Sequence, residues 1–352
     1  MENSLPLIYD LDLADLRAQF DTWEEPAYRA LQVWQGLYQQ LWGAPEDFSS
    51  LPAALRQKLA ANFRFSGLES VVDLESKDGE TAKSLFNLDD GNAIETVLMR
   101  YNERRTLCIS TQAGCAMGCV FCATGQMGFK RHLSSGEIVE QVLYYARQLK
   151  SKGERVTNIV VMGMGEPFHN YKNTMAAIDR LNDGEGFKLG ERRFTISTVG
   201  LVPLIEQFAD EKRQVNLAIS LHATNDAKRS ALLPVNRKYP IAELMQACRE
   251  YVEKTNRRLT FEWALIQDVN DSVENAHDLS QLLKGLMCHV NVIPLNPTKK
   301  YSGHGTTHAR AEAFKAELER FGIPCTIRIR RGIDIQAGCG QLATEAQSAN
   351  RI

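Results

Sequence analysis

Residues 114–122 read Gly114-Cys115-Ala116-Met117-Gly118-Cys119-Val120-Phe121-Cys122 and place three cysteines at the spacing C-x3-C-x2-C. Thiolates are soft ligands that suit iron–sulfur clusters and zinc. With eight cysteines in 352 residues, so tight a group is not expected by chance. Three thiolates leave one iron of a 4Fe–4S cube open to a substrate, as at an open catalytic metal site. We therefore predict a 4Fe–4S cluster at Cys115, Cys119 and Cys122. The alternatives are a zinc site completed by Cys108 or His132, and three buried core thiols.

The rest of the composition is that of an ordinary globular protein. Hydrophobic residues make up 44% of the chain and charged residues 24%, which is the usual balance of a soluble fold. We find no run of about 18 apolar residues, no signal-peptide pattern and no disulfide framework among the cysteines. We therefore expect a cytoplasmic protein without a membrane span. The formal net charge of −2 gives no overall support for nucleic-acid binding, so an RNA site would need local basic patches.

The sequence before residue 105 predicts two structural parts. Residues 1–63 carry apolar side chains at helical spacing, which predicts a small helical domain. Residues 64–104 predict a connector with a β-hairpin, because Asp90-Gly91 lies between two apolar stretches. Glu95 falls in the second strand of this hairpin, where the local pattern alone places it toward solvent.

From residue 105 to residue 345, strands and helices alternate. Apolar strands are predicted at residues 106–110, 158–164, 194–198, 215–221, 259–266 and 289–295, with 326–330 closing the series. Repeated βα units imply parallel strands with right-handed crossovers, and about six units are too few for a closed eight-stranded barrel. We therefore predict an α/β fold, a partial (βα)6 barrel over 105–345, followed by a short tail at 346–352. The chemistry of such barrels lies at the C-terminal ends of the strands.

The cysteine stretch carries a family resemblance. Its spacing resembles the signature of the radical S-adenosylmethionine (SAM) enzymes. Residues 108–115, Cys-Ile-Ser-Thr-Gln-Ala-Gly-Cys, and residues 121–126, Phe-Cys-Ala-Thr-Gly-Gln, are similar to one branch of them, the RlmN/Cfr family of RNA adenine methyltransferases. The resemblance covers about residues 93–345 and implies a 4Fe–4S cluster and SAM as cofactors. It also implies that the N-terminal helical domain is an accessory domain that helps to hold RNA.

The resemblance assigns the SAM contacts to predicted strand ends. The positions are Gly165, Glu166, Ser197, Ser220, Leu221, His222 and Asn296. Glycine lets the backbone approach a ligand closely, and a carboxylate can hold the ammonium group of SAM. Hydroxyl, imidazole and amide groups suit its ribose and carboxylate. Taken singly, the polar residues could be ordinary strand ends, and it is their convergence that supports a binding site.

A lone cysteine, Cys339, lies in a glycine-rich loop near the C-terminus. On its own it could be a small buried residue, or a reactive thiol whose pKa the neighbouring arginines lower. The surrounding string resembles the family's Gly-x-Asp-Ile-x-Ala-x-Cys-Gly-Gln-Leu, with Gly338 where many members have alanine, and implies that Cys339 is methylated during turnover. The resemblance further implies that Cys108 is a second catalytic cysteine and that Glu95 is a proton acceptor. The remaining cysteines match no family position and are interpreted as structural: Cys248, Cys288 and Cys325.

Basic residues occur in five short clusters. They are Arg104-Arg105, Lys130-Arg131, Arg192-Arg193, Lys299-Lys300 and Arg328 with Arg330 and Arg331. Each cluster alone could be a solvated surface. Several adjoin predicted strand ends, so we expect them to ring the cleft and contact phosphates.

The resemblance also implies the reaction. An adenine C2–H has no nucleophilic character, so the family uses two SAM molecules and radical chemistry. Cys339 takes a methyl group, the radical made from that group attacks the base in a covalent protein–RNA adduct, and Cys108 releases the product as a disulfide forms. The implied targets are C2 of an adenine in the peptidyl-transferase centre of 23S rRNA and in tRNA next to the anticodon. An electron donor such as flavodoxin is a further implied partner.

Three alternatives stay open at this point. Methylation at C8 of the same rRNA adenine, which confers antibiotic resistance, uses the same cysteines. A radical SAM enzyme with a different substrate would leave no methyl group on Cys339. A non-enzymatic iron–sulfur protein with Cys108 as fourth ligand would hold a cluster whose EPR spectrum does not respond to SAM.

Overall fold

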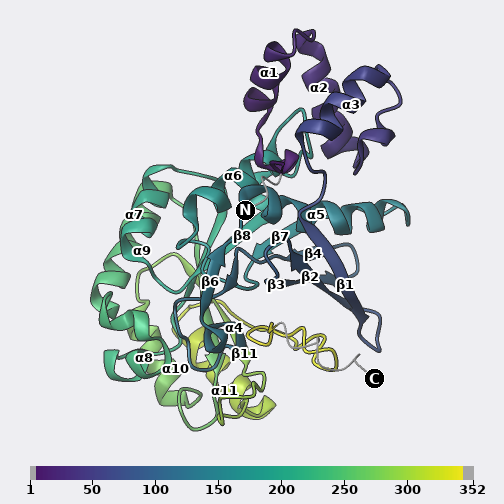
Figure 1. The fold of residues 1–352 in the computed structure, drawn as a ribbon. Coiled ribbons are helices and arrows are strands. Elements are labelled where there is room, and N and C mark those ends of the chain that lie inside the picture. The colour runs from purple at the N-terminus through teal and green to yellow at the C-terminus, as the bar shows by residue number, and fades with distance from the viewer. Residues whose placement is uncertain (1–4, 344–352) are drawn as a thin grey trace.

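The computed structural model describes residues 5–343, and the predicted domain end at 345 and tail at 346–352 lie outside them. Its centre is a ten-stranded sheet in the order β1-β2-β3-β4-β7-β8-β9-β10-β11-β12, and β5 and β6 form a separate pair (Figure 1). The strands are β1 (Leu68–Glu75), β2 (Thr81–Leu88), β3 (Ala93–Arg100), β4 (Arg105–Cys108), β5 (Gln112–Gly114), β6 (Phe129–His132), β7 (Asn158–Val161), β8 (Phe194–Thr198), β9 (Asn216–Ser220), β10 (Leu259–Leu265), β11 (Cys288–Pro294) and β12 (Cys325–Ile327).

The helices divide into an N-terminal group and the helices that connect the strands. The α-helices are α1 (Leu13–Thr22), α2 (Ala27–Gln35), α3 (Ala53–Asn62), α4 (Ala123–Met127), α5 (Ser135–Lys150), α6 (Tyr171–Asn182), α7 (Val202–Asp210), α8 (Asp226–Leu232), α9 (Ile241–Thr255), α10 (Val273–Leu282) and α11 (His308–Arg320). A π-helical turn at Gly36–Gln40 extends α2. Short 3₁₀ turns lie at Ile8–Asp10, Pro45–Asp47, Glu191–Arg193 and Pro234–Arg237.

The strands β4 and β7 to β12 run parallel to one another. At least one helix joins each to the next, and these helices form the outer layer (Figure 1). The sheet order does not bring β12 back to β1, so the barrel stays open. The predicted partial α/β barrel is confirmed. Parallel strands are buried on both faces, as Leu217, Ala218 and Ile219 in β9 show.

The antiparallel strands β1 to β3 extend the same sheet. The sequence predicted two strands here, and the structure has three, with β3 paired to β4 through Val97 and Cys108. The expectation that Glu95 faces solvent is wrong, because its side chain is fully buried. On one face of β3 the Thr96 Oγ1 donates to Gln141 Oε1 of α5 at 2.7 Å. On the other face, the C-terminal segment covers Glu95, whose Oε2 accepts from the backbone N–H of Ala343. Neither face of the strand is therefore exposed to solvent at this point.

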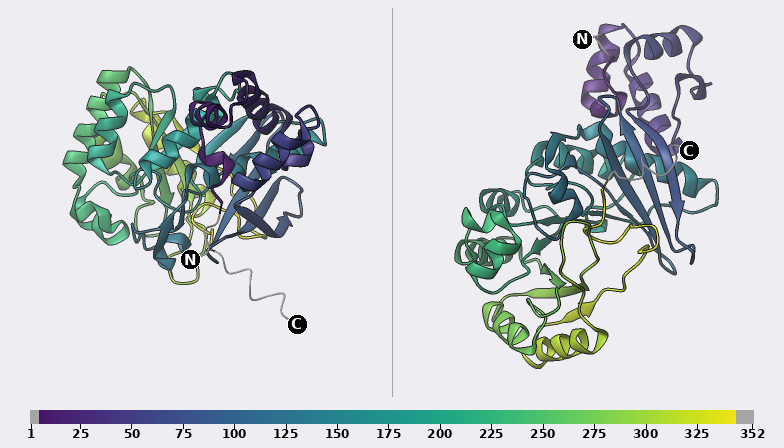
Figure 2. Two further views of the ribbon diagram at one scale, coloured as in Figure 1. Left: turned by 45° about the horizontal axis from the view of Figure 1, so that its top comes forward. Right: turned by 60° about the horizontal axis from the view of Figure 1, so that its bottom comes forward.

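The N-terminal helices form a separate group at one end of the molecule and pack on α5 and the end of α6 (Figure 2). The Trp34 indole donates to Asp183 Oδ1 at 2.8 Å, and the Arg147 guanidinium donates to the carbonyl of Leu41 at 2.9 Å. The domain boundaries at 63, 104 and 345 stay predictions. Among residues 5–343, none of the helices combines the length and apolar character that crossing a bilayer requires.

Candidate active site

The three clustered cysteines lie on the loop between β5 and β6, which also contains the short helix α4. Gly114 ends β5 with φ +71°, and a Cβ there would lie 1.8 Å from the carbonyl oxygen of Gly128. Only glycine permits both this backbone conformation and so close an approach. The β5–β6 pair therefore fixes the start of the loop. Cys119 is buried, and Cys115 and Cys122 are half-buried.

The thiols of this loop have the chemistry of metal ligands. Burial raises the pKa of Cys115 to about 12 and that of Cys119 well above its ordinary value. Such thiols need a positive metal centre to exist as thiolates. Three soft sulfur donors on one loop fit three irons of a 4Fe–4S cluster.

A cavity of about 170 Å³ opens beside this loop at the C-terminal ends of the parallel strands. It brings together most of the residues that the sequence predicted: Cys119, Cys122, Gly165, Glu166, Ser197, Ser220, His222, Asn296 and Cys339. Leu221 does not line the cavity, because its side chain is buried in the core and its backbone N–H donates to the carbonyl of Glu262 at 3.2 Å. Convergence from β7, β8, β9 and β11 is what the barrel rule predicts.

His222 presents one defined ring nitrogen to this cavity. The backbone N–H of Ala264 donates to His222 Nδ1 at 2.9 Å, which places the ring proton on Nε2. Burial, aided by the charge of Arg229, lowers the pKa of His222 to about 3. The imidazole is therefore neutral at physiological pH and offers Nε2–H as a donor. The Phe121 ring packs edge-on against it at 5.1 Å between centroids.

Glu166 is buried and firmly oriented. Its Oε1 accepts from the backbone N–H of Phe168 and its Oε2 from that of Val199, each at 3.0 Å. Burial raises its pKa to about 7, although these hydrogen bonds favour the charged form. The preceding Gly165 has φ +105°, and a Cβ there would lie 2.6 Å from the Cβ of Gln112. The glycine is thus needed for packing as well as for the close backbone approach that the sequence suggested.

Two further groups in the cavity have unused hydrogen-bonding capacity. Asn296 Nδ2 donates to the carbonyl of Cys339 at 3.1 Å, while its buried Oδ1 accepts no hydrogen bond. The hydroxyls of Ser197 and Ser220 lie 3.4 Å apart. Buried polar atoms are rarely left unpaired. An acceptor, two hydroxyls and an imidazole donor fit the polar groups of SAM.

Cys339 and Cys108 line one small cavity of about 70 Å³, together with Cys122. Cys339 also lines the larger cavity, so it lies on the wall between the two. Cys339 is exposed overall, but the chain packed around its sulfur raises the pKa of the thiol. The guanidinium of Arg328, which lines the same small cavity, acts in the opposite direction and lowers that pKa, as the sequence suggested. Burial raises the pKa of Cys108 to about 12. Residues far apart in the chain therefore meet beside the cluster loop.

Glu95 lines neither of these two cavities. Its Oε1 lies 2.9 Å from Lys83 Nζ, and its Oε2 accepts from the backbone N–H of Ala343 at 2.9 Å. It shares one face of β3 with Val97 and Met99, which do line the small cavity. The structure thus places Glu95 at the base of the Cys339 loop.

Sequence reasoning missed two buried charged residues around the site. Glu262, on β10, lines the larger cavity, and its Oε2 lies 4.0 Å from Arg328. Arg229 is fully buried and donates to the carbonyls of Val199 at 2.6 Å and Ser220 at 3.2 Å. A lone carboxylate within an apolar strand was a signal that could have identified Glu262. Arg229 lies in an ordinary helix, and the residues around it gave no indication that it is buried.

The basic clusters do not ring this site as expected. Arg104-Arg105 and Arg192-Arg193 precede β4 and β8, so they lie at the opposite, N-terminal ends of the strands. Lys299-Lys300 and Arg328 stay near the candidate site, where they line neighbouring cavities. Because these clusters adjoin strands, we expected them to surround the cleft. The end of the strand that a cluster adjoins decides whether it lies on the side of the candidate site or on the opposite side of the barrel.

Comparison with known proteins matches this geometry. Residues 109–279 match the radical SAM superfamily. The dual-specificity RNA methyltransferase RlmN 1 of Myxococcus xanthus is 50% identical over 344 residues, which are 98% of this chain and 96% of that relative. The chain belongs to the RlmN family of radical SAM RNA methyltransferases. A crystal structure of a radical SAM methyltransferase from Sphaerobacter thermophilus, 50% identical, matches with a TM-score of 0.95 over 97% of this chain and 100% of that one.

Membership in the RlmN family confirms several predictions. The family resemblance and the radical SAM fold are confirmed. The radical SAM superfamily uses a 4Fe–4S cluster and SAM, so both predicted cofactors are confirmed at the level of the family. The roles of individual residues stay predictions.

Proposed function

We propose that this chain methylates C2 of an adenine in 23S rRNA and in tRNA, through a methylated Cys339. The observation that carries the proposal is that Cys339 and Cys108 share one cavity with the cluster ligand Cys122. A plain iron–sulfur protein has no need for two further thiols there. We further propose a cytoplasmic location and reduction by a flavodoxin-like donor.

In this proposal the cluster loop and the strand ends hold the cofactors. Cys115, Cys119 and Cys122 would hold a 4Fe–4S cluster. Such a cluster would supply the one-electron chemistry that converts SAM into a radical source. His222 Nε2–H donates to the ligand and Asn296 Oδ1 accepts from it, since both face the cavity with capacity to spare.

The protein thiols carry the methyl group. Cys339, as a thiolate, would attack the methyl carbon of one SAM and displace S-adenosylhomocysteine, and the Arg328 guanidinium favours the thiolate that this step needs. The S-methyl group of Cys339 would then give up one hydrogen atom to the adenosyl group of a second SAM, and its carbon would bond to the adenine. The adduct would lose the ring proton and return one electron to the cluster. Cys108, as a thiolate, would then attack the Cys339 sulfur and break its bond to the transferred carbon. That carbon takes up a proton, which gives the methylated base and leaves a disulfide for the donor to reduce. Glu95 remains our proposed acceptor of the ring proton, and it would have to exchange its contact with Ala343 for one with the base.

Mass spectrometry of nucleosides from 23S rRNA and tRNA tests this proposal. The RNA would come from cells that lack an endogenous enzyme and express this chain, its Cys339→Ala variant or its Cys325→Ala variant. We expect 2-methyladenosine in both RNAs with the wild type and with Cys325→Ala, whose altered residue is buried in β12, and none with Cys339→Ala. 8-Methyladenosine would assign the chain to the C8 activity. Neither nucleoside, from protein with an intact cluster, would refute the substrate assignment.

A further inference from the structure

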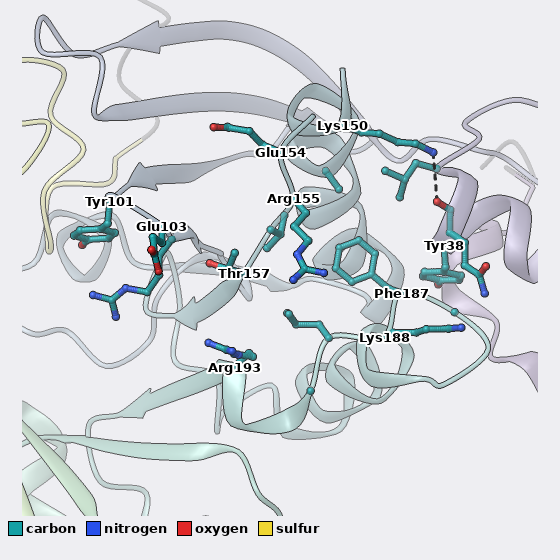
Figure 3. A pocket seen from close by; sticks show the side chains of 18 of the residues that line it. Tyr38, Tyr101, Glu103, Lys150, Glu154, Arg155, Thr157, Phe187, Lys188 and Arg193 are labelled. Carbon is teal, nitrogen blue, oxygen red and sulfur yellow. Dashed lines mark hydrogen bonds between the residues drawn. The ribbon is translucent and has the colours of Figure 1, made fainter. Parts of the chain in front are cut away.

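A large cavity in the described part of the chain lies away from the candidate active site. It has a volume of about 1220 Å³ and is lined by residues that precede β4, β7 and β8 (Figure 3). It therefore lies at the N-terminal ends of the parallel strands, whereas the cluster loop and the predicted SAM residues lie at the C-terminal ends. Tyr38 and Gln39 of the N-terminal helices complete its wall. Lys150 Nζ donates to the carbonyl of Gln40 at 3.0 Å and ties the two parts together at this wall.

Positive charge predominates in this cavity. Its basic lining residues are Arg104, Lys150, Arg155, Lys188, Arg193 and Arg331, against the acidic Glu103 and Glu154. Glu154 is already paired with Arg105. Arg155, Lys188 and Arg193 are exposed, and their side chains make no hydrogen bond or ion pair with any of residues 5–343. In Figure 3, Arg155 and Arg193 point into the same open space. In a chain with a formal net charge of −2, this is a local concentration of unneutralised cations.

Aromatic surfaces lie among these cations. The guanidinium of Arg104 lies 5.3 Å from the ring centroid of Tyr101, and that of Arg331 lies 4.5 Å from it. Phe187 is half-buried and lines the cavity beside Lys188. Cations combined with accessible aromatic faces are the usual means of binding single-stranded nucleic acid, because phosphates meet the cations and bases stack on the rings.

We propose that this cavity binds the phosphodiester backbone of the RNA substrate at a distance from the modified base. The inference rests on the proposed function, since it names a second contact for the same RNA. The volume exceeds the roughly 300–1,000 Å³ typical of small-molecule sites. The unpaired cations are spread over two connecting segments, α5–β7 and α6–β8, which suits consecutive phosphates better than one small anion.

Neighbouring positions of two chain segments line both cavities. Tyr101 and Arg331 line the basic cavity, while Met99 and Arg328 line the cavity of Cys108 and Cys339. In our proposal the RNA extends from the reacting thiols to the basic cavity along these two segments. The N-terminal helices form part of the wall of the basic cavity, so in this proposal they also contact the RNA.

The test compares two double variants of the holoenzyme. Arg155→Gln/Arg193→Gln removes two unpaired cations from the cavity. Arg258→Gln/Lys284→Gln removes two exposed cations that precede β10 and β11, at the same end of the barrel but outside the cavity. Fluorescence anisotropy would measure the affinity of each protein for unmodified full-length tRNA over a range of salt concentrations. Cluster absorbance and melting temperature would check that both variants fold.

We expect the cavity variant to bind tRNA about tenfold more weakly near 0.1 M salt and to lose about two units from the slope of log affinity against log salt. The control variant should match the wild type. Equal affinity and slope in all three proteins would overturn the inference and leave the proposed function intact. If the wild type itself binds no tRNA and no 23S rRNA fragment at low salt, the proposed function fails first. Loss of binding to inorganic pyrophosphate without loss of tRNA binding would assign the cavity to a small anion and would also overturn the inference.

Discussion

Lys83 and Glu95 form a buried ion pair that holds both ends of the loop carrying Cys339. The Lys83 Nζ lies 2.9 Å from Glu95 Oε1, and the two side chains are 5% and 0% exposed. Lys83 Nζ also donates to the carbonyl of Gln336 at 3.3 Å, and Glu95 Oε2 accepts from the backbone N–H of Ala343 at 2.9 Å. Cys339 lies between these two anchor points. The pair on β2 and β3 therefore connects the antiparallel extension of the sheet to the proposed chemistry.

Removing one partner of this pair should cost more than removing both charges. Lys83→Met removes the ammonium group that lies against the buried Glu95 carboxylate, and we expect a loss of roughly 3–5 kcal/mol in the free energy of unfolding. Lys83→Met/Glu95→Gln should recover part of that loss. Urea denaturation of the four proteins of the double-mutant cycle measures this coupling. Lys77→Met, at an exposed position of the β1–β2 turn, is the matched control and should change stability little. Additive losses would show that the pair does not act as a unit.

Replacing either of the two proposed catalytic thiols should stop the reaction at a different stage. With Cys339→Ala no methyl carrier exists, so methyl transfer should fall by roughly 10⁴-fold or more, and no covalent protein–RNA species should form. With Cys108→Ala the release step is missing, so a covalent species should accumulate. Denaturing gels with labelled tRNA distinguish the two results. Cys248→Ala, at a buried cysteine of α9, should behave as the wild type. An adduct formed by Cys339→Ala would contradict the assigned roles.

His222 should make the fold sensitive to acid. Its pKa is about 3 in the folded protein against an ordinary 6.5. Below pH 6.5 the unfolded chain therefore takes up a proton that the folded protein does not, and stability falls as the pH drops toward 3. Between pH 8 and pH 5 this residue alone should cost about 2 kcal/mol.

The variant His222→Asn isolates this effect. Asparagine tolerates the positive φ of 59° and keeps an acceptor for the N–H of Ala264, but it cannot take up a proton. Urea denaturation at pH 8 and pH 5 should show a smaller pH-dependent loss for His222→Asn than for the wild type. His304→Gln, at an exposed position, should show the wild-type loss. Equal pH dependence in all three proteins would refute this account.

Arg229 should be a positioning residue for the SAM cavity. Its guanidinium holds the carbonyls that follow β8 and end β9, so Arg229→Met leaves buried acceptors unpaired. We expect a loss of roughly 2–4 kcal/mol in stability and a weaker affinity for SAM, seen as a higher KM with a smaller change in kcat. Arg213→Met, which breaks surface ion pairs, should cost under about 1 kcal/mol and leave KM unchanged. A KM for Arg229→Met equal to that of the wild type would remove the positioning role.

The chain sequence by itself determined the chemistry and the architecture. The spacing of Cys115, Cys119 and Cys122 predicts cluster ligands from a local pattern, because it places three thiols on one short loop. The alternation of apolar strands with amphipathic helices specified the open barrel, since each βα unit is a local pattern. The rule that parallel strands place their C-terminal ends together then brought Glu166, Ser220 and Asn296 to one cavity before any coordinates were known.

Only the tertiary structure decided burial and partnership between distant segments. Glu95 occupies a position that the alternation of apolar and polar residues in its strand assigns to the surface. In the structure, the C-terminal segment covers its side chain and Lys83 neutralises its charge. Arg193 adjoins a strand, yet it lies at the end away from the proposed chemistry, in a cavity completed by the N-terminal helices. The physical reason is the same in both cases. The burial of a side chain and the charge around it depend on all the residues that pack against it. Many of these residues are distant in the sequence, so the local sequence pattern does not reveal them.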